Sequence, residues 1–350
     1  MTETRTVEPR HPFIELTIAR LLTMLREPEM IFWVFVFPLL MALALGIAFR
    51  TPSETTVAVG VEEGAGAAEL AATLSAHQGV EIVRVAPGET ATALRDGLAH
   101  VIVAPGKPPA YRYDPTRPES RLARQTVDDL LQRAAGRKDV WTGREETVTV
   151  PGSRYIDWLI PGLLGMNIMG TGMWGIGFTV VVQRARKLLK RLIATPMRRP
   201  QFLAALVTAR LVLLGLEVAA LVGFARLIFG VPIEGSLASL AVVSLLGAMT
   251  FGGLGLLTAS RARTVEGVSG IMNVVMVPMW ICSGVFFAAS NFPDPMQPFI
   301  QALPLTALID ALRAVMLDGS DLIATGSELL ILAAWGAGSF GLALKLFRWR

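Results

Sequence analysis

Long runs without any charged side chain are the feature that most constrains how this chain can fold. No Asp, Glu, Lys or Arg occurs between Asp157 and Arg184, a run of 26 residues. A helix needs about 20 predominantly apolar residues to cross the hydrocarbon core of a bilayer. Only 17% of the 350 residues are charged and the mean hydropathy is +0.53, whereas soluble domains average about 25% charged residues. The sequence therefore predicts an α-helical integral membrane protein rather than a soluble enzyme.

Six apolar runs are long enough to be spans. The predicted spans are residues 30–50, 155–184, 201–229, 236–260, 267–289 and 326–346. An even number of spans puts both termini on one side, and Lys and Arg near the span ends concentrate there, which predicts that this side is cytoplasmic. The first run has a rival interpretation as a cleaved signal peptide, because Ala42-Leu43-Ala44 resembles a cleavage site. About 30 residues with several acids precede it, which is long for a signal peptide, so we favour an uncleaved span.

Residues 1–29 form the predicted cytoplasmic N-terminus. Between residues 11 and 28, apolar residues such as Ile14 and Leu21 alternate with polar ones in a helical pattern. The pattern predicts an amphipathic helix lying in the membrane interface. A cytoplasmic extension of the first span is the alternative, because periodicity alone does not separate the two.

Residues 51–154 resemble a water-soluble domain. Strand-like segments at 57–61, 80–85, 100–104 and 111–113 alternate with helix-like segments at 65–76, 89–98 and 118–135, and residues 148–150 are a possible closing strand. This alternation predicts a small α/β domain with a partly parallel sheet. Long translocated domains are exempt from the positive-inside rule, so we place it outside the membrane, between the first and second spans. No catalytic constellation is visible in it, which favours a binding or structural role.

Residues 290–326 are a further unusual segment, because four prolines interrupt an apolar stretch: Pro293, Pro295, Pro298 and Pro304. The segment is too short and too broken for a pair of spans. Irregular backbone is tolerated at membrane depth only where protein or a water-filled cavity covers it. We predict an outer re-entrant or interfacial helical hairpin that forms a lid over a pathway.

Few side chains in the spans offer chemistry. Glu217 is the one acid deep in a span and is a functional candidate by default. We favour a structural pairing, because Arg210 lies two turns away on the same helix face. Asn167 and Asn273 are predicted to hydrogen-bond between helices, with substrate contact as the alternative. The three histidines are scattered and there is one cysteine, so no metal site and no catalytic residue is predicted. We attribute the net charge of +4 to loops facing anionic lipid and predict no nucleic-acid partner.

The second span ends in a cationic cluster that contains no acid: Arg184, Arg186, Lys187, Lys190, Arg191, Arg198 and Arg199. Within it, Leu188, Leu189 and Leu192 recur at helical spacing. The pattern predicts a short amphipathic helix at the cytoplasmic face, with one apolar side available to a partner. The sequence contains no P-loop motif, so the chain is not a self-contained nucleotide-driven motor.

Several motifs taken together resemble one family. They are Tyr155 followed by Ile160-Pro-Gly-Leu-Leu-Gly-Met-Asn167, the run Arg186 to Met197, Ser283-Gly-Val-Phe-Phe287, Pro304-Leu-Thr306, Ala311-Leu-Arg313 and Phe37-Pro38. They are similar to motifs of the permease subunits of ATP-binding-cassette exporters of the ABC-2 (type V) class, in the branch with a large extracytoplasmic domain after the first span. The likeness covers essentially the whole chain.

The resemblance implies a homodimer in the bacterial cytoplasmic membrane, surrounded by membrane lipids. Two copies of a separate ABC ATPase subunit would bind ATP and Mg²⁺, and no cofactor is implied on this chain. The coupling loop, residues 184–200, would contact the ATPase through Arg186, Lys187, Leu188, Leu189, Lys190, Arg191, Leu192, Thr195 and Pro196. The candidate translocation pathway comprises Asn167, Met169, Met173, Asn273, Met276, Phe286 and Phe287. Family members often carry an acid among the basic residues before the Leu pair, and Gln183-Arg184-Ala185-Arg186 has none.

The sequence thus favours the permease subunit of an ATP-driven exporter. Its solute would be hydrophobic or amphipathic, such as a drug, a lipid or a lipid-linked glycan, moved out of the cytoplasm or the inner leaflet. A membrane-anchored ligand sensor or scaffold that uses the outer α/β domain is the alternative. An ion-coupled carrier ranks last, because it requires paired intramembrane charges or an inverted repeat.

Overall fold

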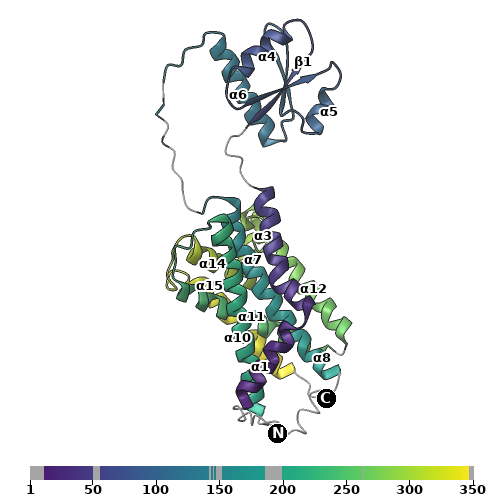
Figure 1. Ribbon diagram of the computed structural model, residues 1–350, viewed down its shortest axis with the longest axis vertical. Coiled ribbons are helices and arrows are strands. Elements are labelled where there is room, and N and C mark those ends of the chain that lie inside the picture. Colours follow the sequence, from purple (N-terminus) through teal and green to yellow (C-terminus); the bar gives the residue numbers. More distant parts are fainter. Residues whose placement is uncertain are drawn as a thin grey trace, which may run out of the picture. The chain divides into compact units, whose positions relative to one another are not determined.

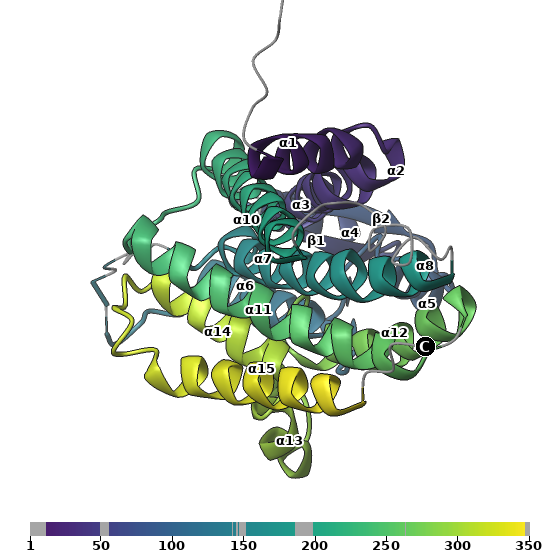
Figure 2. The ribbon, with the colours of Figure 1, turned by 90° about the horizontal axis from the view of Figure 1, so that it is seen from below.

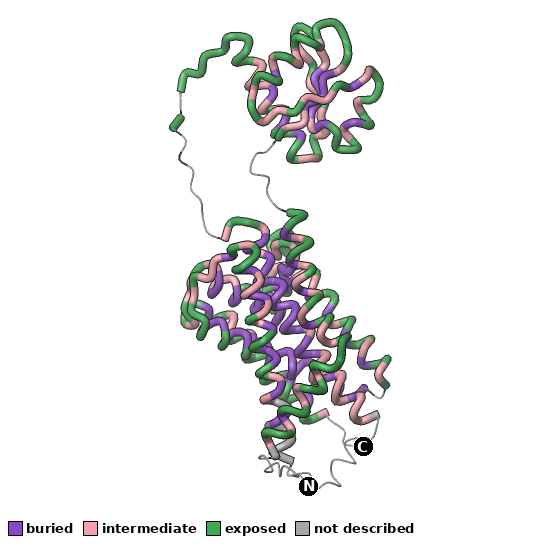
Figure 3. The backbone as a smooth tube through the Cα atoms, in the orientation of Figure 1, coloured by how far each residue is buried: buried purple, intermediate pink, exposed green. Residues whose placement is uncertain are grey.

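The computed structural model describes residues 12–49, 56–141, 143–144, 146, 152–185, 199–262 and 264–346. The chain divides into two compact units, which are an inserted α/β unit, Thr51–Val148, and a helical unit formed by the chain on either side of it. The insertion ends six residues before the predicted boundary at 154. In each unit the buried residues lie at its centre (Figure 3).

Six helices of the helical unit are long and apolar enough to cross a membrane, as predicted. They are Pro28–Ala48, Tyr155–Arg184, Thr208–Phe229, Leu237–Arg261, Val265–Cys282 and Gly326–Leu346. The first consists of α2 (Pro28–Ile31), a π-helical turn η1 (Phe32–Val36) and α3 (Phe37–Ala48), and the second of α7 (Tyr155–Gly172), a π-helical turn η2 (Met173–Phe178) and α8 (Thr179–Ala185). The third lies in α10 (Arg199–Phe224) and η3 (Ala225–Phe229), and the others are α11 (Leu237–Arg261), α12 (Val265–Cys282) and α15 (Gly326–Leu346).

The fifth span is shorter than predicted. It ends at Cys282 instead of continuing to residue 289. Gly284 has a φ of 79°, in the left-handed region that only glycine adopts readily and that a right-handed helix does not contain. The apolar composition of the Ser283–Phe287 motif hid this break.

Helix α11 is the centre of the helical unit, lying between α7 and α15 (Figure 2). Glycines bring its backbone close to the second span. A Cβ on Gly172 would lie 2.8 Å from the Cβ of Phe251, and one on Gly255 would lie 2.8 Å from the carbonyl oxygen of Met173. Small residues permit such close packing between membrane helices.

The N-terminal helix α1 (Pro12–Leu25) is separate from the first span. Arg26 and Glu27 interrupt the helix before α2 begins at Pro28. Helix α1 packs against α10, and a second side of it, formed by Ile14, Ile18 and Leu22, is exposed. An exposed apolar stripe fits a helix whose surface meets lipid, and its location in the interface remains a prediction.

A bent helix pair follows the fifth span, in the region where the sequence predicts a hairpin. The short elements η4 (Ala289–Asn291), η5 (Asp294–Met296) and α13 (Gln297–Gln301) lead into α14 (Pro304–Met316). The bend between Asp294–Gln301 and Pro304–Met316 is 82°. Pro304 occupies the first turn of α14, a position where its missing N–H is not needed. Most of α14 is buried, including Leu308 and Leu312.

The α/β unit has the predicted alternation of strands and helices (Figure 1). Its strands are β1 (Val57–Glu62), β2 (Val80–Val85), β3 (Val101–Ala104) and β4 (Ala110–Tyr113), in the order β2-β1-β3-β4. Strand β1 is parallel to β2 and β3, and β4 is antiparallel to β3, so the sheet is partly parallel as predicted. The possible strand at 148–150 lies outside the described residues.

Helices cover both faces of this sheet. Residues of α4 (Ala67–Ser75) and α6 (Pro118–Ala134) pack with Val59 and Val103 on one face. Ala93 of α5 (Thr90–Arg95) packs with Ile102 on the other. The Tyr111 hydroxyl donates to Asp128 Oδ1 at 3.0 Å, joining β4 to α6. Partial burial and this hydrogen bond raise the pKa of Tyr111 to about 12.

Candidate functional site

The predicted coupling residues lie outside the described residues. These are Arg186, Lys187, Leu188, Leu189, Lys190, Arg191, Leu192, Thr195 and Pro196. The structure describes what flanks them, since α8 ends at Ala185 and α10 begins at Arg199. Arg184, in the last turn of α8, donates to the carbonyls of Ala259 (3.2 Å) and Ala262 (3.3 Å) at the end of α11. This contact ties the second span to the fourth just before residues 186–196, which contain the predicted coupling residues and which we call the coupling segment.

The predicted pathway residues differ in how far the helical unit buries them. Three methionines, Met169, Met173 and Met276, belong to the buried core of the helical unit, and Asn167 is also buried. Phe286 is half-buried, whereas Asn273 and Phe287 are exposed. A pathway through these residues therefore requires either a second chain or a rearrangement of this one, and their role remains a proposal.

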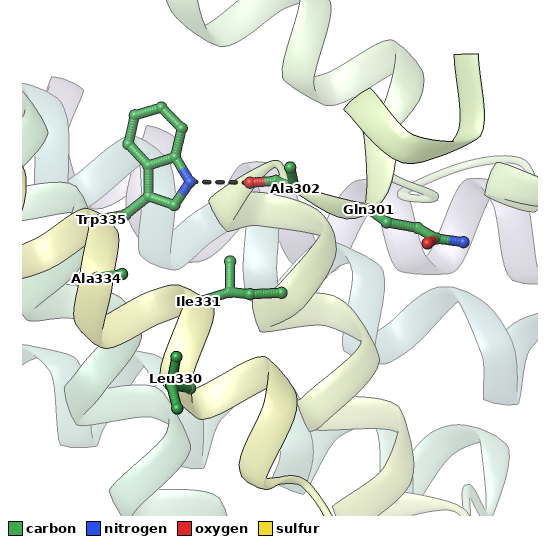
Figure 4. A pocket seen from close by; sticks show the side chains of 6 residues that line it. All are labelled: Gln301, Ala302, Leu330, Ile331, Ala334 and Trp335. Atoms are coloured by element: carbon green, nitrogen blue, oxygen red, sulfur yellow. Dashed lines mark hydrogen bonds between the residues drawn. The ribbon is translucent and has the colours of Figure 1, made fainter. Parts of the chain in front are cut away.

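An open apolar groove lies elsewhere, between the α13–α14 bend and α15. Its lining residues are Gln301, Ala302, Leu330, Ile331, Ala334 and Trp335 (Figure 4). The Trp335 indole nitrogen donates to the carbonyl oxygen of Ala302 at 2.8 Å. The groove has no titratable side chain, so it offers contact area rather than chemistry.

Two charged residues deep in the third span, Arg210 and Glu217, form an ion pair, which confirms the predicted pairing. Glu217 is 1% exposed, and Arg210 Nη1 lies 2.8 Å from Glu217 Oε1. Seven residues are two helical turns, so both side chains lie on one face of α10. A single buried charge in a bilayer is costly, and an opposite charge in contact offsets much of that cost.

Thr171 on α7 extends the ion pair to the second span. Its hydroxyl oxygen accepts a hydrogen bond from Arg210 Nη2. The same oxygen lies 3.1 Å from Glu217 Oε2, 2.9 Å from the carbonyl oxygen of Asn167 and 3.4 Å from that of Ile168, so its one proton has three possible acceptors. Sequence reasoning did not single out Thr171, because a threonine in a membrane helix usually bonds only to its own backbone.

Asn167 extends the same network to the first span. Its Nδ2 donates to the carbonyl oxygen of Val34 at 3.0 Å. Pro38 lies four residues after Val34 and has no N–H, so it cannot donate the helical hydrogen bond that this carbonyl would otherwise accept. Asn167 therefore supplies the donor that Pro38 removes. The sequence contained a sign of this contact, because Pro38 lies in one apolar run and the amide of Asn167 in the next.

The four side chains form one polar network, which we call the core network: Asn167, Thr171, Arg210 and Glu217. It joins the first three spans at a depth where the lipid provides no hydrogen bonds. The second and third spans are also the two that flank the coupling segment. The core network therefore holds together the helices on which a partner at that segment would act.

We expect Asn167→Leu to destabilise the protein by about 1–3 kcal/mol, because it leaves the Val34 carbonyl buried without a donor. In a Pro38→Ala background the restored N–H can donate to Val34, so the same substitution should cost clearly less. Thermal unfolding of the four variants in detergent measures this difference. An equal cost in both backgrounds would show that Asn167 acts independently of Pro38.

Comparison with known proteins gives the family. A family model described as ABC-2 type transporter matches residues 123–317. Among curated proteins, the chain is 27% identical over 169 residues to ABC transporter G family member 20 of Dictyostelium discoideum, covering 48% of this chain and 23% of that protein. It is 23% identical over 173 residues to the inner membrane transport permease YhhJ of Escherichia coli (49% and 46%) and 30% identical over 112 residues to nodulation protein J of Rhizobium meliloti (32% and 42%).

The chain spans less than half the length of these relatives. The family match covers 195 of the 350 residues and includes the second to fifth spans and the bent pair. This multi-pass membrane protein therefore belongs to the ABC-2 type transporter family, whose members are membrane-spanning subunits of ABC transporters.

Proposed function

We propose that this chain is the membrane-spanning subunit of an ATP-driven exporter and that a separate ATPase subunit powers it. The family match across the spans carries this proposal. Two sequence features support it, namely the absence of a P-loop motif from the 350 residues and the cationic, leucine-containing segment between α8 and α10. ATP and Mg²⁺ would then bind to the partner, and this chain would undergo the conformational change that moves the solute.

The contact with the ATPase is the coupling segment, residues 186–196. Its three leucines supply apolar anchors and its Lys and Arg residues a cationic rim, which fits a hydrophobic groove with an acidic border. Arg184 and the core network fix the helices on both sides of the segment. A movement of the segment would therefore move the first three spans together rather than bend one of them.

The solute is hydrophobic or amphipathic and leaves the cytoplasm or the inner leaflet. Away from the span ends, the charged side chains inside the described spans are Arg210 and Glu217, with Arg226 one turn from the end of the third. Arg210 and Glu217 neutralise each other. The rest of the described spans is apolar, and the buried methionines between them, such as Met169, Met173 and Met276, would adapt to apolar molecules of varied shape once the helices move apart.

A second copy of this chain completes the transporter, and Asn273 supports this part of the proposal. Asn273 lies midway along α12 and is exposed, and its amide makes no hydrogen bond within the described part of the chain. An unpaired amide facing lipid is unfavourable. Gly270 lies on the same exposed side with nothing within 4 Å of an added Cβ, so another helix can approach closely. Two copies related by a two-fold axis would let each amide donate to the other.

Co-purification tests the function itself. We expect the ABC ATPase encoded nearest to this chain to co-purify with the wild type and to be lost from a Leu188/Leu189/Leu192→Asp variant, because three carboxylates replace the apolar anchors. A matched control adds the same charges at exposed residues of the α/β unit, as Leu98/Leu122/Val140→Asp, and should retain the ATPase. A folded wild type that binds no ATPase would contradict the exporter and favour a ligand sensor built on the α/β unit.

Disulfide cross-linking tests the dimer seam. In a Cys282→Ser background, Asn273→Cys should form a covalent dimer in membranes at least several-fold more efficiently than Leu216→Cys, which is also exposed in a span but lies on α10. Non-reducing electrophoresis measures both. Efficient cross-linking at residue 216 and none at residue 273 would place the contact between copies elsewhere.

A further inference from the structure

The first turn of α7 is a junction of several segments that are distant in the sequence. Phe49 is the last described residue before the inserted α/β unit, and its ring lies 4.5 Å from that of Tyr155, just after the insertion. Gly152, with a φ of 87°, packs against Leu317 at the end of α14, where an added Cβ would lie 3.4 Å from the Leu317 Cβ. Phe49 and Gly152, which flank the insertion within the helical unit, therefore meet at this turn.

Arg154 fixes the same turn to the third span. Its Nη2 lies 2.7 Å from Oδ1 of Asp157, whose side chain is almost fully buried, and its backbone N–H donates to Asp157 Oδ2 at 3.3 Å. It also donates to the carbonyl oxygens of Phe229 (2.9 Å) and Gly230 (3.3 Å), where η3 ends. The hydrogen bond to Asp157 raises the pKa of Arg154, so this clamp stays charged over the whole physiological range. These hydrogen bonds fix the position of the first turn of α7, against which another segment packs.

The segment attached to it is residues 283–288, which connect α12 to η4 without regular helix and which we call the exit strap. Val285 at its centre is fully buried and lies so close to α7 that a Cβ on Gly162 would be 2.6 Å from the Val285 carbonyl oxygen. Non-helical backbone at membrane depth requires donors from neighbouring groups. Side chains that donate hydrogen bonds to the carbonyl oxygens of the strap therefore hold it in place.

Two side chains supply those donors. The Tyr155 hydroxyl donates to the carbonyl oxygen of Phe286 at 3.2 Å. Arg313, on α14, donates through Nη2 to the carbonyl oxygen of Gly284. The Arg313 guanidinium in turn lies 3.9 Å above the centre of the Trp158 ring and 3.6 Å from Asp310. Arg313 therefore joins α7, α14 and the strap.

We propose that Tyr155, Trp158 and Arg313 are positioning residues of the transporter's exit, which hold the exit strap closed and release it when the ATPase changes state. This inference rests on the proposed function. The strap is held by a few side-chain contacts instead of a continuous helical ladder, so it can open while α7 and α14 stay folded. A cation over an aromatic ring re-forms readily after such a movement, because the contact tolerates sliding of the guanidinium across the ring face.

The single cysteine of the chain is a native reporter for this movement. Cys282 immediately precedes the strap and is partly buried. In the wild-type complex with its ATPase, a membrane-impermeant maleimide should modify Cys282 slowly without nucleotide and about tenfold faster after vanadate trapping. With Tyr155→Phe or Arg313→Met, modification should be fast in both states, because the strap has lost a donor.

Matched variants distinguish release of the exit strap from a general loss of structure. We call the three side chains that hold the strap, Tyr155, Trp158 and Arg313, the latch. Trp335→Phe removes a hydrogen bond to Ala302 in the same bent region but not in the strap, and it should keep the wild-type dependence on nucleotide. Arg313→Lys keeps the charge and should give intermediate labelling. Tyr155→Phe removes one oxygen atom and is therefore the deciding variant if Arg313→Met does not fold.

ATPase co-purification and ATP hydrolysis are measured on the same samples. If Tyr155→Phe retains its ATPase and shows the slow, nucleotide-dependent labelling of the wild type, the latch is wrong and the exporter stands. If the wild type itself binds no ATPase, the proposed function is what has failed. Labelling that is fast without nucleotide in the variant, with hydrolysis retained, supports the latch, because a structural defect alone would not remove only the nucleotide dependence.

Discussion

The ion pair between Arg210 and Glu217 is the constraint that most restricts how the first three spans can pack. Either charge alone inside the third span would be among the least favourable features that a membrane helix can carry. Together, at 2.8 Å and away from lipid, they are tolerated only while Thr171 and the neighbouring helices keep them covered. The pair therefore requires the second span to stay in place, and through Asn167 it requires the first.

The same physical constraint recurs wherever a helix ends or bends. Lipid offers no hydrogen bonds, so every backbone carbonyl released from a helix needs a donor from the protein. Side chains supply these donors throughout the described helical unit, by contacts of Asn167 with Val34, Arg184 with Ala259 and Ala262, Arg154 with Phe229 and Gly230, Tyr155 with Phe286, Arg313 with Gly284, and Trp335 with Ala302. Each joins two elements that are not neighbours along the chain. The irregular points of the backbone are thus also the points at which the spans are connected.

The core network and the exit strap differ in how much regular helix surrounds them, and this difference affects how each would respond to a partner. The core network joins three spans that stay helical on both sides of it, two of which flank the coupling segment. The exit strap has no helix of its own and depends on donors from α7 and α14. A displacement of the coupling segment would therefore move the spans joined by the core network as a rigid body. The conformational change would occur at the exit strap.

Local patterns in the sequence predicted the secondary-structure elements and the contacts within one helix. The six spans follow from run length, the sheet from alternating apolar segments, and the Arg210–Glu217 pair from its seven-residue spacing on one helix. The end of the fifth span was predicted too late, because composition does not report the left-handed φ of Gly284. The partners of Asn167 and Arg313 were out of reach, because they lie 133 and 29 residues away and depend on how spans pack. The burial of the pathway residues was also out of reach, since periodicity gives the face of a helix and not what covers it.

The dependence of the fold on the buried pair can be measured most directly with Arg210→Met, Glu217→Met and the double variant, by thermal unfolding in detergent. Each single substitution leaves one charge buried without its partner and should cost about 3–5 kcal/mol. The double variant removes both charges, keeps similar side-chain volume, and should cost much less than either single one. If its cost instead equals the sum of the single costs, the two charges act independently and the pair does not hold the spans together.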